Sequence, residues 1–402
     1  MLFEPDRHVP LAGVAWDADR ARDAIHAIVA DLEASRRANG SWPAHPLDDE
    51  GEEPATGFQS LYLGAAGTLW ALWYLRQQGA ATLSFAPETL IGACADAYRA
   101  HPDTEEVVPS YFLGEAGILL VQWRLTGSAD AADRLWSVVE SNIPNPTNEA
   151  LWAAPGTMVA AWHMLQWTGE PRWRDLFLAN VEQLWRTWQP DERTGCHLWT
   201  QDLYGRRRQL LGAGHGFAGN AYPLLRGAAL LPAVQRDELC ERTLQTLRAT
   251  ARREGGGANW YPEAGPTPRE GKILVQWCHG APGIVTGVAD YPVGRCAEMD
   301  ALLVQAGHTV WTAGPLAKGP GLCHGTAGNG YAFLALYRRT GDAVWLERAR
   351  AFAMHAIVQR EAMHAQHGRG RFTLWTGDPG VAVYLWHCVV GAGSMPCLDV
   401  VD

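Results

Sequence analysis

The sequence predicts an all-α fold in which seven outer and seven inner helices form an α/α toroid, a closed double ring. Three observations support this prediction. A short Gly-x-x-Gly motif recurs seven times along the 402 residues, an apolar segment follows each copy, and an amphipathic segment separates most copies from the next. A chain built from such units buries its core by stacking neighbours, because one unit alone cannot cover its apolar face.

The repeated motif places two small residues three positions apart. Successive copies lie about 52 residues apart on average, which leaves room for two helices and two loops. Glycine opens a helix, tolerates a positive φ, and lets neighbouring helices approach closely. The copies are Gly64–Gly67, Gly114–Gly117, Ala153–Gly156, Gly216–Gly219, Gly280–Gly283, Gly325–Gly328 and Gly377–Gly380.

The segments that follow the motifs predict the inner helices. Residues 68–75 are typical, since they are almost wholly apolar and stop shortly before Gly79. A helix that is apolar all round must be buried on most sides, and glycine commonly ends a helix. Four further segments stop in the same way, at Gly127, Gly169, Gly341 and Gly391.

The segments between the motifs predict the outer helices, because they mix charged and apolar residues at the helical period. They include residues 17–34, 130–136, 173–177, 236–242 and 345–350. A straight solenoid is the competing arrangement. The ring is preferred because Cys278 and Cys323 occupy equivalent positions in neighbouring repeats, and such positions converge only around a common axis. Residues 1–402 are expected to form a single domain, with the long loops 48–56 and 255–271 over the mouth of the ring.

Composition narrows the functional classes. Hydrophobic residues make up 47% of the chain, enough for a large core. The net charge of −10 argues against a nucleic-acid-binding protein. No apolar run reaches the length of about 18 residues that a membrane span needs, and the first residues lack the pattern of a secretory signal. The eight scattered cysteines therefore suggest a reducing cytoplasm, where cysteine more often means metal binding or catalysis than disulfides.

Two Cys-His-Gly tripeptides each lead into a glycine motif. Cys278, Cys323 and His324 offer three ligands of the types that zinc prefers, and three protein ligands leave one tetrahedral position open, as in catalytic sites. His279 is the residue next to Cys278. It could replace Cys278 as a metal ligand, or it could donate a hydrogen bond to a ligand without touching the metal itself. If the inner helices all start at one end of the ring, their dipoles should lower the pKa of thiols there.

These two motifs, together with the seven glycine motifs, resemble the LanC family of lanthionine cyclases. The chain is more similar to the LanC-like branch than to the lantibiotic cyclases, and the resemblance covers nearly its whole length. It implies a seven-repeat toroid with one central Zn²⁺ bound by two cysteines and one histidine. It also implies that a thiol is added to dehydroalanine or dehydrobutyrine to form a thioether. Lantibiotic cyclases use a peptide cysteine, whereas LanC-like members look adapted to glutathione.

The resemblance extends to individual positions outside the metal ligands. His215 matches a family histidine thought to protonate the enolate, and Glu149 matches a carboxylate four residues before the third motif. Lys318 matches a lysine that LanC-like members carry near the thiol substrate, five residues before Cys323. Leu274 stands where lantibiotic cyclases have arginine, which disfavours a peptide cyclase specifically.

The expected chemistry needs a thiolate, a proton donor and positioning groups. Metal coordination deprotonates a thiol whose free pKa is about 8.5. A histidine such as His215 titrates near neutrality and suits proton transfer, with Glu149 as its acid/base partner. Trp277 is expected to form a wall of the pocket. Arg369 or Arg371 could bind substrate carboxylates, on the basis of charge alone.

Two other functions remain open. A non-catalytic, regulatory protein could bind glutathione or a peptide through zinc; it would need the metal but no proton donor such as His215. A carbohydrate-active toroid would use paired carboxylates in a tryptophan-lined groove, and the 19 tryptophans favour it. The duplicated Cys-His-Gly motif argues against that third class. The partners we expect are a thiol and a peptide or protein with a dehydroamino acid, with no nucleic acid and no membrane span.

Overall fold

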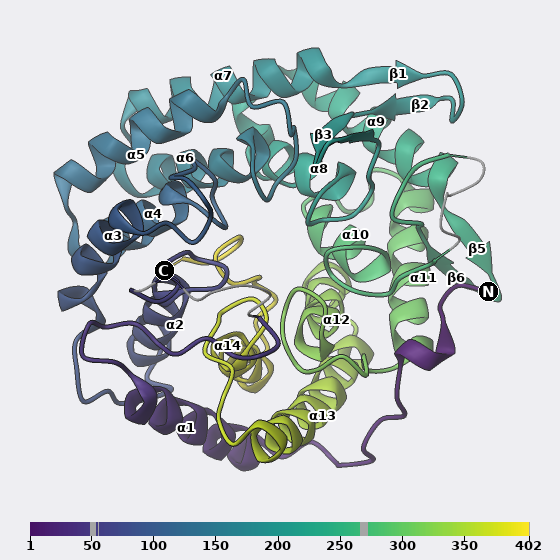
Figure 1. Ribbon diagram of the computed structural model, residues 1–402. Helices are drawn as coiled ribbons and strands as arrows, with labels where there is room; N and C mark the ends of the chain where they lie inside the picture. Colours follow the sequence, from purple (N-terminus) through teal and green to yellow (C-terminus); the bar gives the residue numbers. More distant parts are fainter. Residues whose placement is uncertain (49–53, 55, 266–271, 402) are drawn as a thin grey trace.

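The helices form two concentric rings (Figure 1). The computed structural model describes residues 1–48, 54, 56–265 and 272–401. The outer helices are α1 (Ala18–Ser35), α3 (Ile91–Ala100), α5 (Ala129–Asn142), α7 (Pro171–Thr187), α9 (Ala233–Thr250), α11 (Ala297–Ala313) and α13 (Ala343–His367). The inner helices are α2 (Ala65–Gln77), α4 (Glu115–Thr126), α6 (Ala154–Thr168), α8 (Phe217–Arg226), α10 (Ala281–Gly287), α12 (Thr326–Thr340) and α14 (Asp378–Val390).

The contacts between helices close the ring. Each inner helix packs against the next along the chain, and α14 packs against α2. The outer helix α1 also packs against α14, which joins the two ends of the chain. The predicted α/α toroid is therefore confirmed, and the straight solenoid is wrong.

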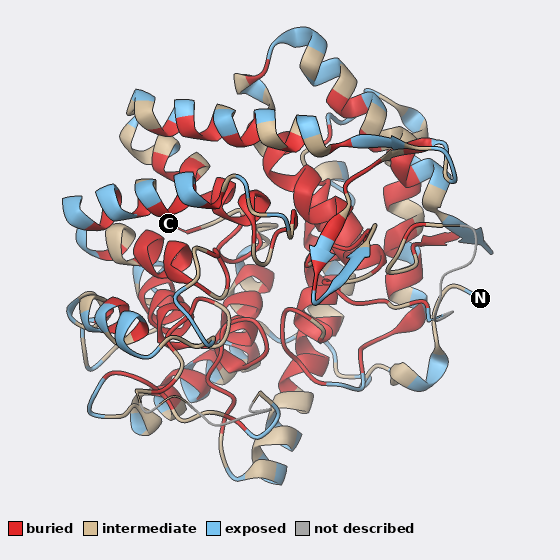
Figure 2. Cartoon of the chain, turned by 45° about the horizontal axis from the view of Figure 1, so that its top comes forward, coloured by how far each residue is buried: buried red, intermediate tan, exposed pale blue. Residues whose placement is uncertain are grey.

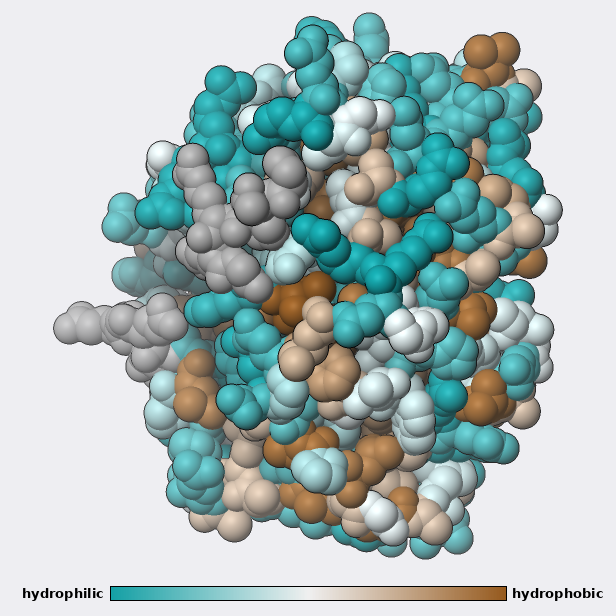
Figure 3. Space-filling model, turned by 90° about the vertical axis from the view of Figure 1, so that its right-hand side faces the viewer, coloured by the Kyte–Doolittle hydropathy of each residue, from teal (hydrophilic) through white to brown (hydrophobic). Residues whose placement is uncertain are grey.

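Burial follows the two rings as the sequence predicted. In α2 every residue from Ala65 to Leu75 is buried, whereas α5 buries one face through residues such as Leu135 and Val139. Figure 2 shows the inner helices mostly buried and the outer helices striped. On the side of the ring that carries α11, hydrophilic residues cover most of the surface and hydrophobic ones lie in small groups (Figure 3). Burial of the inner set is what stabilises the ring, because apolar surface leaves water there.

Each glycine motif sits where a loop becomes an inner helix. Its first residue is the N-cap, and only Gly280 has a positive φ there, 109°. The second glycine is needed for space. A Cβ on Gly328 would lie 1.7 Å from the carbonyl oxygen of Leu322, and the other six motifs show the same overlap at up to 2.3 Å. The loop thus folds back over the first turn, a closer contact than the helix–helix approach that the sequence suggested.

Replacing Gly328 by alanine should lower the free energy of unfolding by about 3 kcal/mol, because backbone must move to admit the methyl group. The control is Gly127→Ala, at a helix end with φ +68° and nothing within 4 Å of the new Cβ. That change should cost about 1 kcal/mol, the penalty of the left-handed conformation alone. Denaturant unfolding of both variants measures the difference, and equal losses would contradict this role of the motif.

Short strands and 3₁₀ turns are the main departures from an all-helical chain. Their three-residue length is too short to give an alternating pattern in the sequence. They form three antiparallel pairs, β1–β2 and β3–β4 between α7 and α8, and β5–β6 between α9 and α10. The strands are β1 (Gln189–Asp191), β2 (Cys196–Leu198), β3 (Gln201–Leu203), β4 (Arg206–Arg208), β5 (Arg252–Glu254) and β6 (Gly257–Asn259). The 3₁₀ turns are η1 (Pro5–Arg7), η2 (Pro87–Thr89) and η3 (Ala228–Leu230).

Two further expectations concern the loops over the mouth of the ring and the absence of a membrane span. The expected cover of the mouth by loops 48–56 and 255–271 falls partly on residues 49–53, 55 and 266–271, which lie outside the described part of the chain, so it stays a prediction. Within the described residues, none of the helices combines the length and apolar character required to cross a bilayer.

The residues after α14 fill the bore of the ring. Figure 1 shows this yellow segment among the inner helices. The carbonyl of Leu398 accepts from Nε2 of His163 at 2.7 Å, and that of Val401 accepts from the indole of Trp70 at 3.2 Å. Tyr222 donates to the carboxylate of Asp399 at 2.8 Å. Side chains from three inner helices therefore hold the C-terminal segment in place.

Candidate metal centre

A chain of backbone hydrogen bonds joins the loops that precede the inner helices. Its members stand two residues before the first residue of their motifs, so they are equivalent by repeat. Each N–H donates to the carbonyl of the next loop, at distances from 2.8 to 3.4 Å. In order from donor to acceptor, the chain runs Gly214, Cys278, Cys323, Trp375, Tyr62 and Phe112. Cys278 donates directly to Cys323 in this series of hydrogen bonds, so the two sulfurs lie close together.

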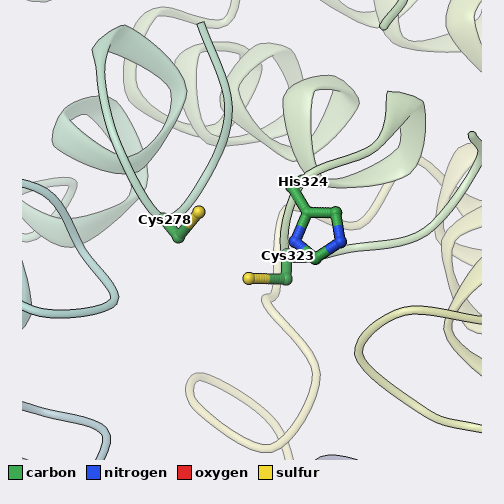
Figure 4. Close-up of side chains that lie close together, drawn as sticks. All are labelled: Cys278, Cys323 and His324. Carbon is green, nitrogen blue, oxygen red and sulfur yellow. The ribbon is translucent and has the colours of Figure 1, made fainter. Parts of the chain in front are cut away.

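The predicted ligand atoms do come together. Those of Cys278, Cys323 and His324 all lie within 4.8 Å of one another. Cys278 projects from the loop before α10, and the other two project from the loop before α12 (Figure 4). Both cysteines are buried, at 8% and 7% exposure, and His324 is half-buried. Two sulfurs and an imidazole nitrogen at this spacing fit a zinc ion, whose bonds are about 2.1–2.3 Å long.

The two thiols have opposite pKa shifts. The hydrogen bond with Cys323 is the largest cause that lowers the pKa of Cys278, and His324 adds to it. The same hydrogen bond, followed by burial, raises the pKa of Cys323. One thiol therefore ionises at the expense of the other. The expected fall in pKa is therefore wrong for Cys323. At Cys278 the pKa does fall, but through these hydrogen bonds, and the lowering by helix dipoles stays a prediction.

Two residues that contact the sulfurs, and an arginine that contacts one of those two, were not singled out from the sequence. The Tyr62 hydroxyl is hydrogen-bonded to Cys323, and burial, followed by the charge of that cysteine, raises the tyrosine pKa well above its ordinary value. Gln276 donates from Nε2 to the sulfur of Cys278 at 3.0 Å and accepts from Arg7 at 3.4 Å. The signal for Tyr62 was present, since it holds the same repeat position as the two cysteines.

His215 and Glu149 form a pair beside this cluster. Nδ1 of His215 donates to Oε2 of Glu149 at 2.8 Å. The carboxylate is fully buried and also accepts the backbone N–H groups of Leu151 and Trp152, at 2.9 and 2.7 Å. Burial lowers the pKa of His215, but the hydrogen bond and charge of Glu149, with the charge of Cys278, outweigh it and raise the pKa. Because Nδ1 is bonded to Glu149, Nε2 is the imidazole nitrogen that this hydrogen bond leaves free to act.

His279 and Trp277 flank Cys278 in different ways. The ring of His279 lies 6.1 Å from that of His215, between centroids, and burial lowers its pKa. Its Nδ1 has no hydrogen-bond partner among the described residues, and it is not part of the three-residue cluster. Trp277 packs against Trp375, with centroids 4.6 Å apart, and lines a small apolar cavity in the bore together with Phe112.

The predicted carboxylate-binding residues lie in distinct settings. Lys318 is exposed on the loop before α12, close enough for its charge to favour ionisation of Cys323. Arg371 is buried and forms an ion pair with Asp48, so its guanidinium is already satisfied. The interpretation of Arg371 as a substrate contact is therefore not supported by its surroundings. Arg369 is half-buried and lines a second small cavity that Arg371 also lines.

Comparison with known proteins agrees with this architecture. The chain is 36% identical over 186 residues to "LanC-like protein GCL1" of Arabidopsis thaliana, a match covering 44% of this chain and 40% of that protein. It is 31% identical over 219 residues to "Glutathione S-transferase LANCL1" of Danio rerio, covering 52% and 49%. The chain thus spans about half the length of these relatives, or less.

A solved structure and a family model extend the comparison over most of the chain. "Nisin cyclase" superposes with a TM-score of 0.64 over 93% of this chain and 98% of that one, at 15% identity, which shows a shared fold. The family model described as "Lanthionine synthetase C-like protein" matches residues 57–391. Because that match covers well over half of the sequence, the chain belongs to the lanthionine synthetase C-like family.

Proposed function

We propose that this protein catalyses the zinc-dependent addition of a thiol, from glutathione or a peptide cysteine, to dehydroalanine or dehydrobutyrine residues. The observation that carries the proposal is the pairing of His215 with a fully buried Glu149 beside a three-ligand cluster. The cluster supplies a place for a nucleophile, and the pair supplies a proton. Addition of a thiol across an activated double bond needs both.

Cys278, Cys323 and His324 would hold the ion. A zinc ion bound there lowers the pKa of a substrate thiol, so that the thiol is present as the thiolate near neutral pH. Tyr62 and Gln276 hydrogen-bond to the two sulfurs, which fixes their positions before any substrate enters. Such outer hydrogen bonds orient ligands and tune their basicity.

The proton balance assigns a role to His215. The substrate sulfur forms a bond to the β-carbon, the π bond between the α- and β-carbons breaks, and negative charge develops on the enolate. Nε2 of His215 gives its proton to the α-carbon, while Glu149 holds Nδ1–H and stabilises the imidazolium. The proton released when the thiol ionises restores the imidazolium. The product is a thioether, with no oxidant or reductant required.

Lys318 is proposed as a contact for a carboxylate of the thiol substrate. Replacing it by alanine should raise KM for glutathione about 2- to 5-fold, the range for an exposed ion pair. Steady-state kinetics with 2-mercaptoethanol, which has no carboxylate, provides the control and should show no change in KM. An equal effect on both thiols would contradict this contact.

A zinc-dependent binding protein without catalysis is the second candidate. It would need neither a buried carboxylate nor a histidine held by it, so the His215–Glu149 pair favours the enzyme. Mass spectrometry separates the two candidates: zinc-loaded protein is incubated with a dehydroalanine peptide and glutathione. A peptide heavier by one glutathione supports the enzyme, whereas tight binding with no adduct from any thiol supports the binding protein.

All eight cysteines are free, and we propose that the protein works in the reducing cytoplasm.

A further inference from the structure

A short hairpin projects beside the His215–Glu149 pair. Strands β3 and β4 are joined by the two-residue turn Tyr204-Gly205, with φ values of 52° and 70°. This is the twist of a type I′ turn, in which glycine or asparagine is usual and an aromatic residue is strained. Tyr204 is nevertheless held: its hydroxyl accepts from the indole of Trp152 at 3.1 Å, and its ring lies edge-on to that of His215, 6.3 Å between centroids.

Tyr204 is exposed in spite of these contacts. Its exposed fraction is 71%, the highest among the large aromatic side chains of the described residues. A strained and exposed aromatic residue at the edge of a reactive histidine is unfavourable for stability alone. Strain of this kind persists where the position of the side chain matters for function. In Figure 1, β3 stands beside the inner helix α8, whose N-terminal loop carries His215.

The second strand carries three consecutive arginines, Arg206, Arg207 and Arg208. The first two are exposed and the third is half-buried. Their guanidinium groups have no ion pair or hydrogen bond within the part of the chain that the structure describes. The whole chain has a net charge of −10, so an unpaired basic strand stands out against it. Such a strand attracts carboxylates.

The register of the hairpin separates the arginines by face. Arg206 pairs with the buried Leu203 and Arg208 with the buried Gln201, so both lie on the face turned toward the protein. Arg207 pairs with the exposed Asp202 on the opposite face. Side chains alternate along a strand, and the neighbours i and i+2 share a face. Arg206 and Arg208 therefore place two positive charges on one face of the hairpin, whose turn residue Tyr204 contacts His215.

We propose that the β3–β4 hairpin is a docking element for the dehydroamino-acid substrate, and that it selects peptides with acidic residues next to the dehydroamino acid. Arg206 and Arg208 pair with those carboxylates, and Tyr204 packs against the peptide as it enters beside His215. The inference rests on the proposed function and names the substrate class of that same site: an acidic, extended peptide segment.

The test compares three dehydroalanine peptides that differ only in the two flanking residues, which are Glu, Gln or Lys. With glutathione as the thiol, kcat/KM should fall in that order, with about a 10-fold difference between the Glu and Lys peptides for two exposed ion pairs. Raising the salt concentration from about 50 to about 500 mM should shrink the difference to about 2-fold. Equal rates for all three peptides at low salt would overturn the proposal and leave the thiol-addition activity standing.

Variants assign the preference to one face of the hairpin. Arg206→Glu with Arg208→Glu should invert the order, so that the Lys peptide reacts fastest. Arg207→Glu is the matched control: it changes one charge of the same strand on the opposite face, and should leave the Glu peptide preferred. A control variant that inverts the order as strongly would contradict the face assignment. Thermal melting of each variant checks that the fold is intact.

Binding measured without chemistry separates failure of the inference from failure of the function. Fluorescence anisotropy uses labelled peptides in which alanine replaces dehydroalanine. Tighter binding of the Glu peptide with no thioether formed from any peptide would support the docking element and contradict the proposed function. A single-stranded RNA that binds more tightly than the Glu peptide would contradict the acidic-peptide assignment.

Discussion

Replacing Cys278 by serine is expected to remove the metal and to lower kcat/KM for thiol addition by more than about 1,000-fold. Loss of groups that merely orient a metal ligand already costs about 10- to 100-fold, and a ligand itself costs more. Without the ion, a substrate thiol with a pKa of about 8.5 remains mostly protonated at neutral pH. Cys323→Ser should behave in the same way, because the two sulfurs lie on one site.

Zinc content and rate, measured on the same preparations, check this expectation. Cys240→Ser is the control, since Cys240 is also buried but lies on the outer helix α9. The control should keep one zinc per chain and the wild-type rate. A Cys278 variant that keeps both would show that the nucleophile is activated elsewhere.

His215→Ala is expected to lower kcat by about 100- to 10,000-fold, the usual contribution of a positioned acid. Zinc content and KM for glutathione should stay close to those of the wild type, because His215 is not one of the three clustered ligands. A lower kcat with unchanged zinc content and KM distinguishes a proton donor from a residue that supports the metal. An unchanged kcat would remove His215 from the reaction.

The pH dependence gives this prediction a second measurement. In the proposed reaction the acid form of His215 is the donor, so kcat should be constant below its raised pKa and fall as the pH rises through it. Glu149→Gln removes the charge that raises this pKa, and the fall should then begin at a lower pH. A profile that is identical in the two proteins would show that another group donates the proton.

The ring could be predicted from the sequence because each repeat unit has one position where the backbone tolerates only glycine. The second glycine of every motif has no room for a Cβ, so glycine recurs there while the rest of the repeat varies. Helix ends at Gly127 and Gly341 were equally readable, since both take a left-handed conformation that favours glycine. Local backbone requirements of this kind can be recognised in a single sequence, because they restrict a position to glycine.

The clustering of the three ligands could be predicted for the same reason. Cys278 and Cys323 hold equivalent positions, and the hydrogen-bonded chain of loops brings such positions together. Applied to the other repeats, the same rule points to Tyr62. The hydrogen bonds of Gln276 and Arg7 could not be found in this way, because they join segments whose proximity depends on the folded ring.

The hairpins and the C-terminal segment lay beyond sequence reasoning. Three-residue strands such as β3 show too few residues for alternation to stand out. The segment around Leu398 hydrogen-bonds to side chains of inner helices that are far away in the chain, among them His163, which is 235 positions from Leu398. The sequence also could not show which arginines near the site are paired. Arg371 forms an ion pair with Asp48, whereas Arg206 has no ion pair with any residue that the structure describes.

The claim that supports all the others is that Cys278, Cys323 and His324 bind one zinc ion and leave room for a substrate sulfur. X-ray absorption spectroscopy at the zinc edge measures this directly on the purified protein. Our account predicts one zinc per chain with two sulfur neighbours, and three sulfur neighbours after glutathione is added. A protein that takes up no zinc, or whose zinc has only nitrogen and oxygen neighbours, would contradict it.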